Sequence, residues 1–148
     1  MSARSAALRL LSRRDYTTAE IRARLTDREF DAEEIDAAIL SLSEAGLLND
    51  RRVASAHVRT ASQVKNRGRL RIRRELEARG IEKTQISEAL AELPEADETA
   101  GIDTFLRRKR LPSKLQPAER RRLIGQLMRR GFSADAISKA LRRQTDEE

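Results

Sequence analysis

The chain has 148 residues, of which 37% are charged and only 3% aromatic, so any core is thin and built mainly from Leu, Ile, Val and Ala. It contains no cysteine, which excludes a disulfide framework and a thiolate metal site. The formal net charge of +7 indicates an acidic partner.

The first 50 residues contain two predicted helix starts of the same kind. Residues 7–14 are expected to form the first helix, after which Thr17 and Glu20 make a capping box for the second. Asp31 is expected to cap the third helix in the same way, with the Glu34 side chain returning a hydrogen bond to Asp31. Gly46 then ends that helix.

The remaining elements follow from the same kinds of signal. A long helix is expected to run through Val53 to about Lys65, and Gly80 and Gly131 occupy left-handed positions at later helix ends. The first repeat has Glu29 at that position instead. Residues 95–98, which are acidic, are expected to be a linker, and residues 117–130 a helix that begins with proline.

One apolar pattern occurs three times at an offset of 51 residues, always as Ile, Leu or Phe with steps of 4, 5, 5 and 4. The three sets are Ile21, Leu25, Phe30, Ile35 and Ile39; Ile72, Leu76, Ile81, Ile86 and Leu90; and Leu123, Leu127, Phe132, Ile137 and Leu141. The pattern predicts an all-α protein of three tandem three-helix repeats, 1–49, 50–94 and 95–148, in an elongated, curved array.

The charge is unevenly distributed along these repeats. Residues 1–50 hold 7 Lys/Arg and 10 Asp/Glu, whereas residues 99–148 hold 13 and 6. Residues 51–74 contain nine basic residues and no acidic one. The first repeat is therefore acidic, and the second and third are basic.

Four arginine-rich clusters are the candidate binding residues, because the planar guanidinium suits phosphate and carboxylate groups. They are Arg67, Arg69, Arg71, Arg73 and Arg74; Arg107, Arg108, Lys109 and Arg110; Arg120, Arg121 and Arg122; and Arg129 and Arg130. Aromatic residues are not interleaved with them, so contact with a nucleic-acid backbone is favoured over base stacking. A solvated helical face is the plainer interpretation of any single cluster.

Other chemistry is not supported. His57 is the only histidine and lies in phase with apolar neighbours, so a packing role is favoured for it, and the sequence offers no catalytic site, metal site or cofactor motif. Residues 32–43 are too acidic for a recognition helix in a DNA groove. No run of 18 apolar residues or signal-peptide core is present, which predicts a cytoplasmic protein, with a monomer as the default.

Three segments resemble the RecX family of regulatory proteins. They are residues 7–25 (ALRLLSRRDYTTAEIRARL), 46–59 (GLLNDRRVASAHVR) and 68–81 (GRLRIRRELEARGI). Position 69 is Arg, where the family is expected to favour proline. The resemblance extends over nearly the whole chain, in order.

The resemblance implies a modulator of the RecA recombinase in DNA repair, recombination and the SOS response. Such a protein is expected to lie in the helical groove of the RecA–single-stranded DNA filament and to inhibit it. It would block extension, favour disassembly and lower the ATPase, strand-exchange and coprotease activities. The alternative is a general nucleic-acid-binding helical protein that acts by coating DNA.

Overall fold

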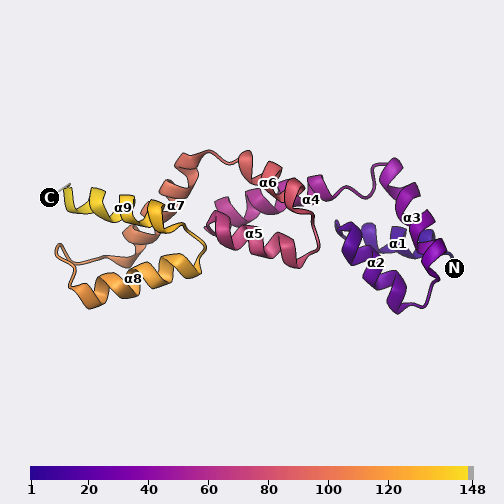
Figure 1. Cartoon of the computed structure of the whole chain (residues 1–148), viewed down its shortest axis with the longest axis horizontal. Helices are drawn as coiled ribbons and strands as arrows, with labels where there is room; N and C mark the ends of the chain where they lie inside the picture. Colours follow the sequence, from indigo (N-terminus) through magenta and orange to yellow (C-terminus); the bar gives the residue numbers. More distant parts are fainter. Residues whose placement is uncertain (147–148) are drawn as a thin grey trace. The chain divides into compact units, whose positions relative to one another are not determined.

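The computed structural model describes residues 1–146, without the side chains of residues 95–97 and 145–146. Over residues 1–146 the chain forms nine α-helices, one π-helical turn and no strand (Figure 1). The elements are α1 (Ala3–Leu11), α2 (Thr18–Asp27), α3 (Ala32–Glu44), α4 (Asp50–Arg59), η1 (Thr60–Val64), α5 (Arg69–Ala78), α6 (Lys83–Ala91), α7 (Glu95–Lys109), α8 (Pro117–Arg129) and α9 (Ala134–Asp146). The all-α prediction is confirmed. The last two residues of the predicted third repeat, 147–148, lie outside the described part.

The helices pack as two compact units. Unit 1 comprises Met1–Ala56 and Glu75–Ala89, and unit 2 comprises His57–Arg74 and Leu90–Glu148. The middle repeat is thus divided, because a thin repeat buries its apolar face against neighbouring repeats. Of the fifteen positions in the apolar pattern, all are buried except Phe30, which is partly buried against the core.

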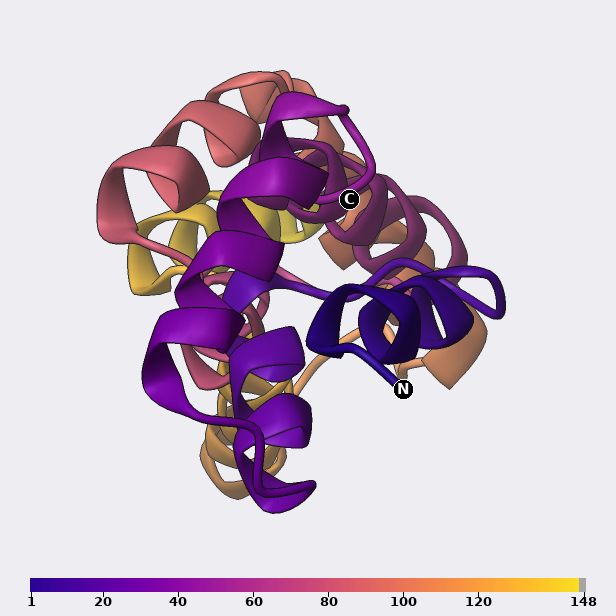
Figure 2. The same ribbon diagram turned by 90° about the vertical axis from the view of Figure 1, so that its right-hand side faces the viewer.

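In unit 1, α1, α2 and α3 surround one apolar core, and they lie together in the foreground of Figure 2. The buried face of α1 includes Ala3, Ala6 and Ala7, all fully inaccessible to solvent. These small side chains let the backbone of α1 approach its neighbours closely. In unit 2, a second core is formed by residues of α7, α8 and α9, including Ile102, Leu127 and Ile137.

The two predicted helix starts differ in the structure. The capping box of α2 is confirmed: Glu20 N donates to Thr17 Oγ1 at 3.1 Å, and Thr17 N donates to Glu20 Oε1 at 2.8 Å. Asp31 caps α3 by accepting from Glu34 N at 2.9 Å. The carboxylate of Glu34, however, accepts from Ala3 N at 3.0 Å, so it satisfies an N–H at the start of α1 and the expected reciprocal bond is wrong.

The second helix of every repeat ends in the same way. At Glu29, Gly80 and Gly131 the backbone is left-handed, with φ of 67°, 82° and 96°. The N–H of the following residue donates to the carbonyl five positions earlier, as from Phe132 N to Leu127 O at 3.2 Å. This is the Schellman arrangement, and it confirms the predicted helix ends, including the non-glycine residue Glu29.

Three predicted boundaries are wrong. The first helix begins earlier, at Ala3, because Ser2 Oγ caps it by accepting from Ser5 N at 3.1 Å. The long helix that was expected to reach Lys65 changes to the π-helical turn η1 at Thr60. The expected linker at residues 95–98 is instead the first turn of α7.

Glu98, in the first turn of α7, has partners from two other segments of unit 2. Its carboxylate accepts from Ser133 N at 2.9 Å, at the start of α9, and lies 3.5 Å from Arg69 Nε. The acidic composition had predicted a linker, whereas Glu98 belongs to a helix and its side chain is only 12% exposed. Within residues 1–146, no helix has both the length and the apolar character to cross a bilayer.

Candidate polyanion-binding surface

A close backbone contact in unit 2 brings the basic segments together. At the start of α5, Gly68 N donates to Arg130 O at 2.8 Å, and Leu70 N donates to Gly131 O at 3.0 Å. A Cβ on Gly68 would lie 2.4 Å from the carbonyl carbon of Gly131, so this approach requires glycine. The contact places the cluster at residues 67–74 beside the cluster at the end of α8.

A cleft of about 470 Å³ opens at this contact and is called here the basic cleft. Its walls come from the end of η1, the start of α5 and the ends of α7 and α8. It is lined by Lys65, Arg67, Arg71, Lys109, Arg129 and Arg130, with Phe105 and Gln126. Six of its eight lining residues are cationic and none is acidic, so a multiply charged anion fits its electrostatics.

The ring of Phe105 helps to position two of these cations. Lys109 Nζ lies 5.4 Å from the ring centroid, and Arg130 Cζ lies 5.0 Å from it. Phe105 itself is only 8% exposed, so its ring is fixed by the core of α7, α8 and α9. Cation–π attraction at these distances limits the freedom of both side chains before any ligand binds.

A second basic hollow, called here the third-repeat hollow, has a volume of about 910 Å³. Its cations are Arg107, Arg110, Lys114 and Arg120. Unlike the basic cleft, it has many apolar lining residues: Leu106, Leu111, Pro112, Leu115 and Leu141. Cationic and apolar groups together suit a protein segment that carries both acidic and apolar side chains.

Arg69 is directed into unit 2 and away from both hollows. Its Nη1 donates to Leu90 O at 2.8 Å, and its Nη2 donates to Leu93 O. Its Nε lies 3.5 Å from Glu98 Oε2. These contacts cap the carbonyl end of α6 and fix the start of α7. Arg69 therefore stabilises the packing of unit 2, although the sequence analysis grouped it with the candidate binding residues.

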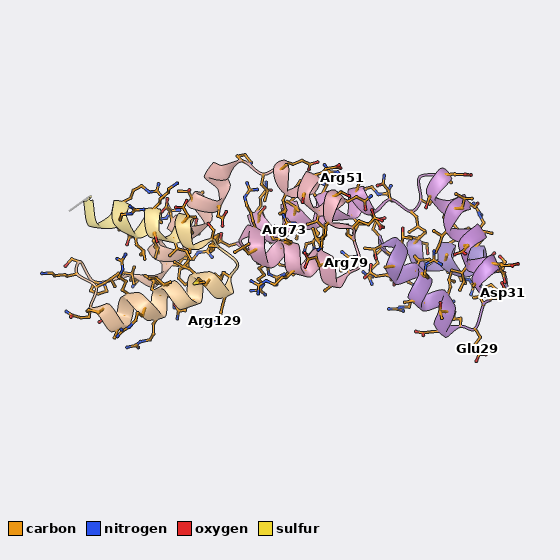
Figure 3. All side chains as sticks on the ribbon, viewed as in Figure 1. Glu29, Asp31, Arg51, Arg73, Arg79 and Arg129 are labelled. Carbon is orange, nitrogen blue, oxygen red and sulfur yellow. The ribbon has the colours of Figure 1, made fainter. Side chains whose placement is uncertain are left out.

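The other predicted cations are dispersed. Arg73 is half-buried on α5 (Figure 3), and Arg74 is exposed, with Nε donating to Leu70 O at 3.4 Å. Arg108 lines a different hollow, beside Asn66 and Gly101. Arg121 and Arg122 are exposed on α8 and belong to neither basic hollow. Three of the four clusters thus contribute to the basic cleft, and the cluster at 120–122 does not.

Three family models match the chain, in order. They are the first three-helix domain of RecX over residues 3–42, the second over residues 49–90 and the third over residues 104–141. The chain belongs to the RecX family. Each matched range lies over one triplet of helices, which confirms three tandem three-helix repeats.

Curated relatives named "Regulatory protein RecX" match most of the chain. The protein of Trichlorobacter lovleyi is 35% identical over 136 residues, covering 89% of this chain and 88% of its own. The protein of Halorhodospira halophila is 36% identical over 140 residues, covering 93% and 84%. The protein of Thermobifida fusca is 32% identical over 148 residues, covering 99% and 80%.

Solved RecX structures share the fold. The crystal structure of RecX from Lactobacillus salivarius matches with a TM-score of 0.90 at 23% identity, covering 99% of this chain and 96% of that one. A second crystal structure, of regulatory protein RecX, matches with a TM-score of 0.82 at 22% identity, covering 93% and 70%. At these identities the likeness concerns the fold alone.

Sequence reasoning missed some residues of the two hollows. Lys65, Lys114 and Gln126 line them but stand outside the four clusters. Lys65 was detectable in principle, because it lies in the acid-free stretch 51–74. His57, on α4, is half-buried, and no group of three or more His, Cys, Asp or Glu side chains in the described part is placed to hold a metal ion.

Proposed function

We propose that this RecX family member regulates the RecA recombinase. It binds the RecA–single-stranded DNA filament in the helical groove and inhibits it by blocking extension and favouring disassembly. ATP hydrolysis, strand exchange and coprotease activity fall as a result. The observation that supports this most directly is the ordered match of all three RecX domains. The relatives' name, "Regulatory protein RecX", agrees with a regulator that has no catalytic activity of its own.

The charge distribution supports separate tasks for the repeats. The basic cleft and the third-repeat hollow both lie in unit 2 and together hold ten Lys and Arg side chains. In this proposal they contact the DNA backbone and acidic surfaces of RecA, without reading base sequence. The acidic first repeat contacts a different, basic surface of the filament. The protein acts in the cytoplasm as a monomer and needs no cofactor.

The alternative proposal is a helical protein that coats nucleic acid, supported by the net charge of +7. The two proposals differ in stoichiometry. A coating protein inhibits RecA only after it occupies most of the DNA, whereas a filament regulator acts when it is scarce.

The test is the rate of DNA-dependent ATP hydrolysis by RecA from the same organism, titrated with this protein well below one copy per RecA subunit. We expect the rate to fall at those ratios. The double variant Arg67→Glu/Arg129→Glu, which reverses two walls of the basic cleft, should inhibit less. Its matched control is Lys139→Glu/Arg142→Glu, the same charge change on exposed positions of α9. Inhibition that begins only when the DNA is saturated would support coating instead.

A further inference from the structure

The third-repeat hollow has an apolar floor that the core of unit 2 holds in place. Leu106 of α7 and Leu141 of α9 line the hollow and belong to that core, with exposed fractions of 2% and 1%. Leu111 and Leu115, in the loop before α8, pack against the same core but stay partly exposed. Because a packed core keeps its shape, a bulky apolar side chain of a ligand can be buried against these leucines without rearrangement of the fold.

Cations surround this apolar floor, and three of them are available to a ligand. Arg107 donates to Thr104 Oγ1 at 3.2 Å. In contrast, the side chains of Arg110, Lys114 and Arg120 form no hydrogen bond, ion pair or ring contact within the described part of the chain. An anion that enters the hollow therefore gains these three cations without breaking an existing ion pair.

The backbone at Arg110 has a conformation that side chains disfavour. This residue is the C-cap of α7, with φ of 49° and ψ of 61°, which is the left-handed region. Glycine adopts this region without steric cost, so an arginine makes the turn less stable. A residue held in a strained conformation beside a hollow, with a side chain that lines it, points to a functional role for that side chain.

The lining of the third-repeat hollow favours an acidic peptide over a nucleic acid. Five of its eleven lining residues are apolar and four are cationic. Among the described residues that line it, none is aromatic, so bases have no ring to stack on. A phosphate backbone also has no bulky apolar group to bury against the leucines. A peptide supplies both kinds of group, because carboxylates can flank an apolar side chain that acts as an anchor.

We propose that the third-repeat hollow is a docking site for a short acidic peptide segment of a partner protein, in which a bulky apolar side chain lies between carboxylates. The apolar side chain packs against Leu111 and Leu115. The carboxylates pair with Arg110, Lys114 and Arg120. The inference rests on the proposed function only for the identity of the partner protein as RecA. It goes further because it gives this hollow a protein ligand and a recognition chemistry that do not depend on DNA.

Two fluorescein-labelled peptides of equal charge test this chemistry. The peptide EDELFDED carries carboxylates and an apolar anchor, whereas EDESSDED carries the carboxylates alone. In fluorescence anisotropy with the unaltered protein and no DNA, EDELFDED should bind at least about 10-fold more tightly, because its apolar side chains leave water on binding. Equal or absent binding of the two peptides would overturn the proposal, since general attraction between charges does not distinguish them.

The first variant is Arg120→Glu, at a half-buried position of the hollow. The affinity for EDELFDED should fall about 10- to 100-fold, because a charge-assisted contact is lost and a repulsive one is gained. The matched control is Arg121→Glu, the same charge change at the next residue of α8, which is exposed and lies outside both basic hollows. It should retain the affinity within about threefold. Equal losses in both variants would show that only net charge matters and would overturn the proposal.

The second variant, Arg110→Gly, separates binding from stability. Glycine relieves the left-handed backbone, so the urea midpoint should rise by about 0.5 M. The affinity for EDELFDED should nevertheless fall about 5- to 10-fold, because a cation of the hollow is removed. A purely structural role for Arg110 would move the midpoint alone. An unchanged peptide affinity in this more stable variant would overturn the proposal.

Oligothymidylate distinguishes a peptide site from a nucleic-acid site. Its affinity should fall less than about threefold in Arg120→Glu, and by the same factor in Arg121→Glu. If Arg120→Glu weakened oligothymidylate as strongly as EDELFDED, the hollow would be a nucleic-acid site and the proposal would be overturned. Failure of the RecA ATPase test with the expected peptide binding would overturn the proposed function and leave this site standing. Normal inhibition of RecA with equal binding of the two peptides would do the reverse.

Discussion

Replacement of Gly131 by alanine tests the geometry on which the basic cleft depends. The residue has two constraints. Its φ is +96°, a left-handed conformation that side chains disfavour, and an added Cβ would lie 2.3 Å from Arg71 Cβ and 2.4 Å from Arg71 N. The second of these atoms belongs to the backbone of α5 and cannot rotate away, so the Gly131→Ala variant must separate α5 from the end of α8.

Substitutions at two other glycines measure the cost of the backbone conformation and the cost of the clash separately. Gly46 ends α3 with φ of +76° and has no atom within 4 Å of an added Cβ, so Gly46→Ala should cost only about 1 to 2 kcal/mol for the backbone conformation. Gly68 has no positive φ but would clash with the backbone of Gly131, so Gly68→Ala should cost about 1 to 3 kcal/mol for overpacking. Gly131→Ala carries both costs, about 2 to 5 kcal/mol.

Urea unfolding followed by far-UV circular dichroism measures these differences. With an m-value of about 2 kcal/mol/M, a loss of 3 kcal/mol lowers the midpoint by about 1.5 M. Hydrogen exchange at Gly68 and Leu70 should accelerate in Gly131→Ala and stay unchanged in Gly46→Ala, because these amides donate to the end of α8. If Gly131→Ala were no more costly than Gly46→Ala, the close approach of α5 and α8 would be refuted.

Three further predictions follow from single contacts. Glu29→Gly should raise the free energy of unfolding by about 1 kcal/mol in urea unfolding, because glycine removes the strain of φ 67°; a decrease would show that the Glu29 side chain has a stabilising contact. Burial opposes ionisation of Glu20, but hydrogen bonds from Arg79 and Thr17 prevail and hold the pKa of Glu20 below its ordinary value of 4.5. The unfolded chain therefore takes up this proton first as the pH falls. The stability from Glu20 is fully present above about pH 4.5 and is lost at lower pH, so in urea titrations the unaltered protein should lose more stability between about pH 5 and 3 than Glu20→Gln; equal losses would contradict this. Arg69→Ala should destabilise unit 2 by about 2 kcal/mol or more, since the carbonyls of Leu90 and Leu93 lose their donor; an unchanged urea midpoint with weakened DNA binding would show that Arg69 is a binding residue after all.

Features specified by nearby residues were predictable from the sequence. The capping box of Thr17 and Glu20 needs only four consecutive residues, and the left-handed helix ends at Gly80 and Gly131 need only one residue of the right type. The repeat was visible because its apolar positions must face a core in every copy. Even Glu29 could be placed in the left-handed region, since its two equivalents are glycines.

Features that depend on distant partners were not predictable. Glu34 was expected to bond within its own turn but accepts from Ala3, 31 positions away. Arg69 was grouped with its neighbours in sequence, although its partners lie 21 to 29 positions along the chain. Glu98 was predicted to belong to an acidic linker because nothing near it in sequence shows that Ser133 and Arg69 contact it. In each case the side chain had several possible partners, and tertiary packing decided among them.

Equivalent positions of the repeat keep the apolar pattern but can change the charge, as Glu20 and Arg71 show. Arg71 alone is one of many arginines in a basic helix, and a solvated role would explain it. Its repeat equivalent, Glu20, forms an ion pair with Arg79 at 2.9 Å that is about three-quarters buried on both sides. The hydrogen bonds at the two sites differ, since the Thr17 side chain donates to Arg79 O whereas the backbone N–H of Gly68 donates to Arg130 O. The repeat therefore predicts which positions are buried, whereas the partner of a charged residue at an equivalent position depends on contacts that differ from one repeat to the next.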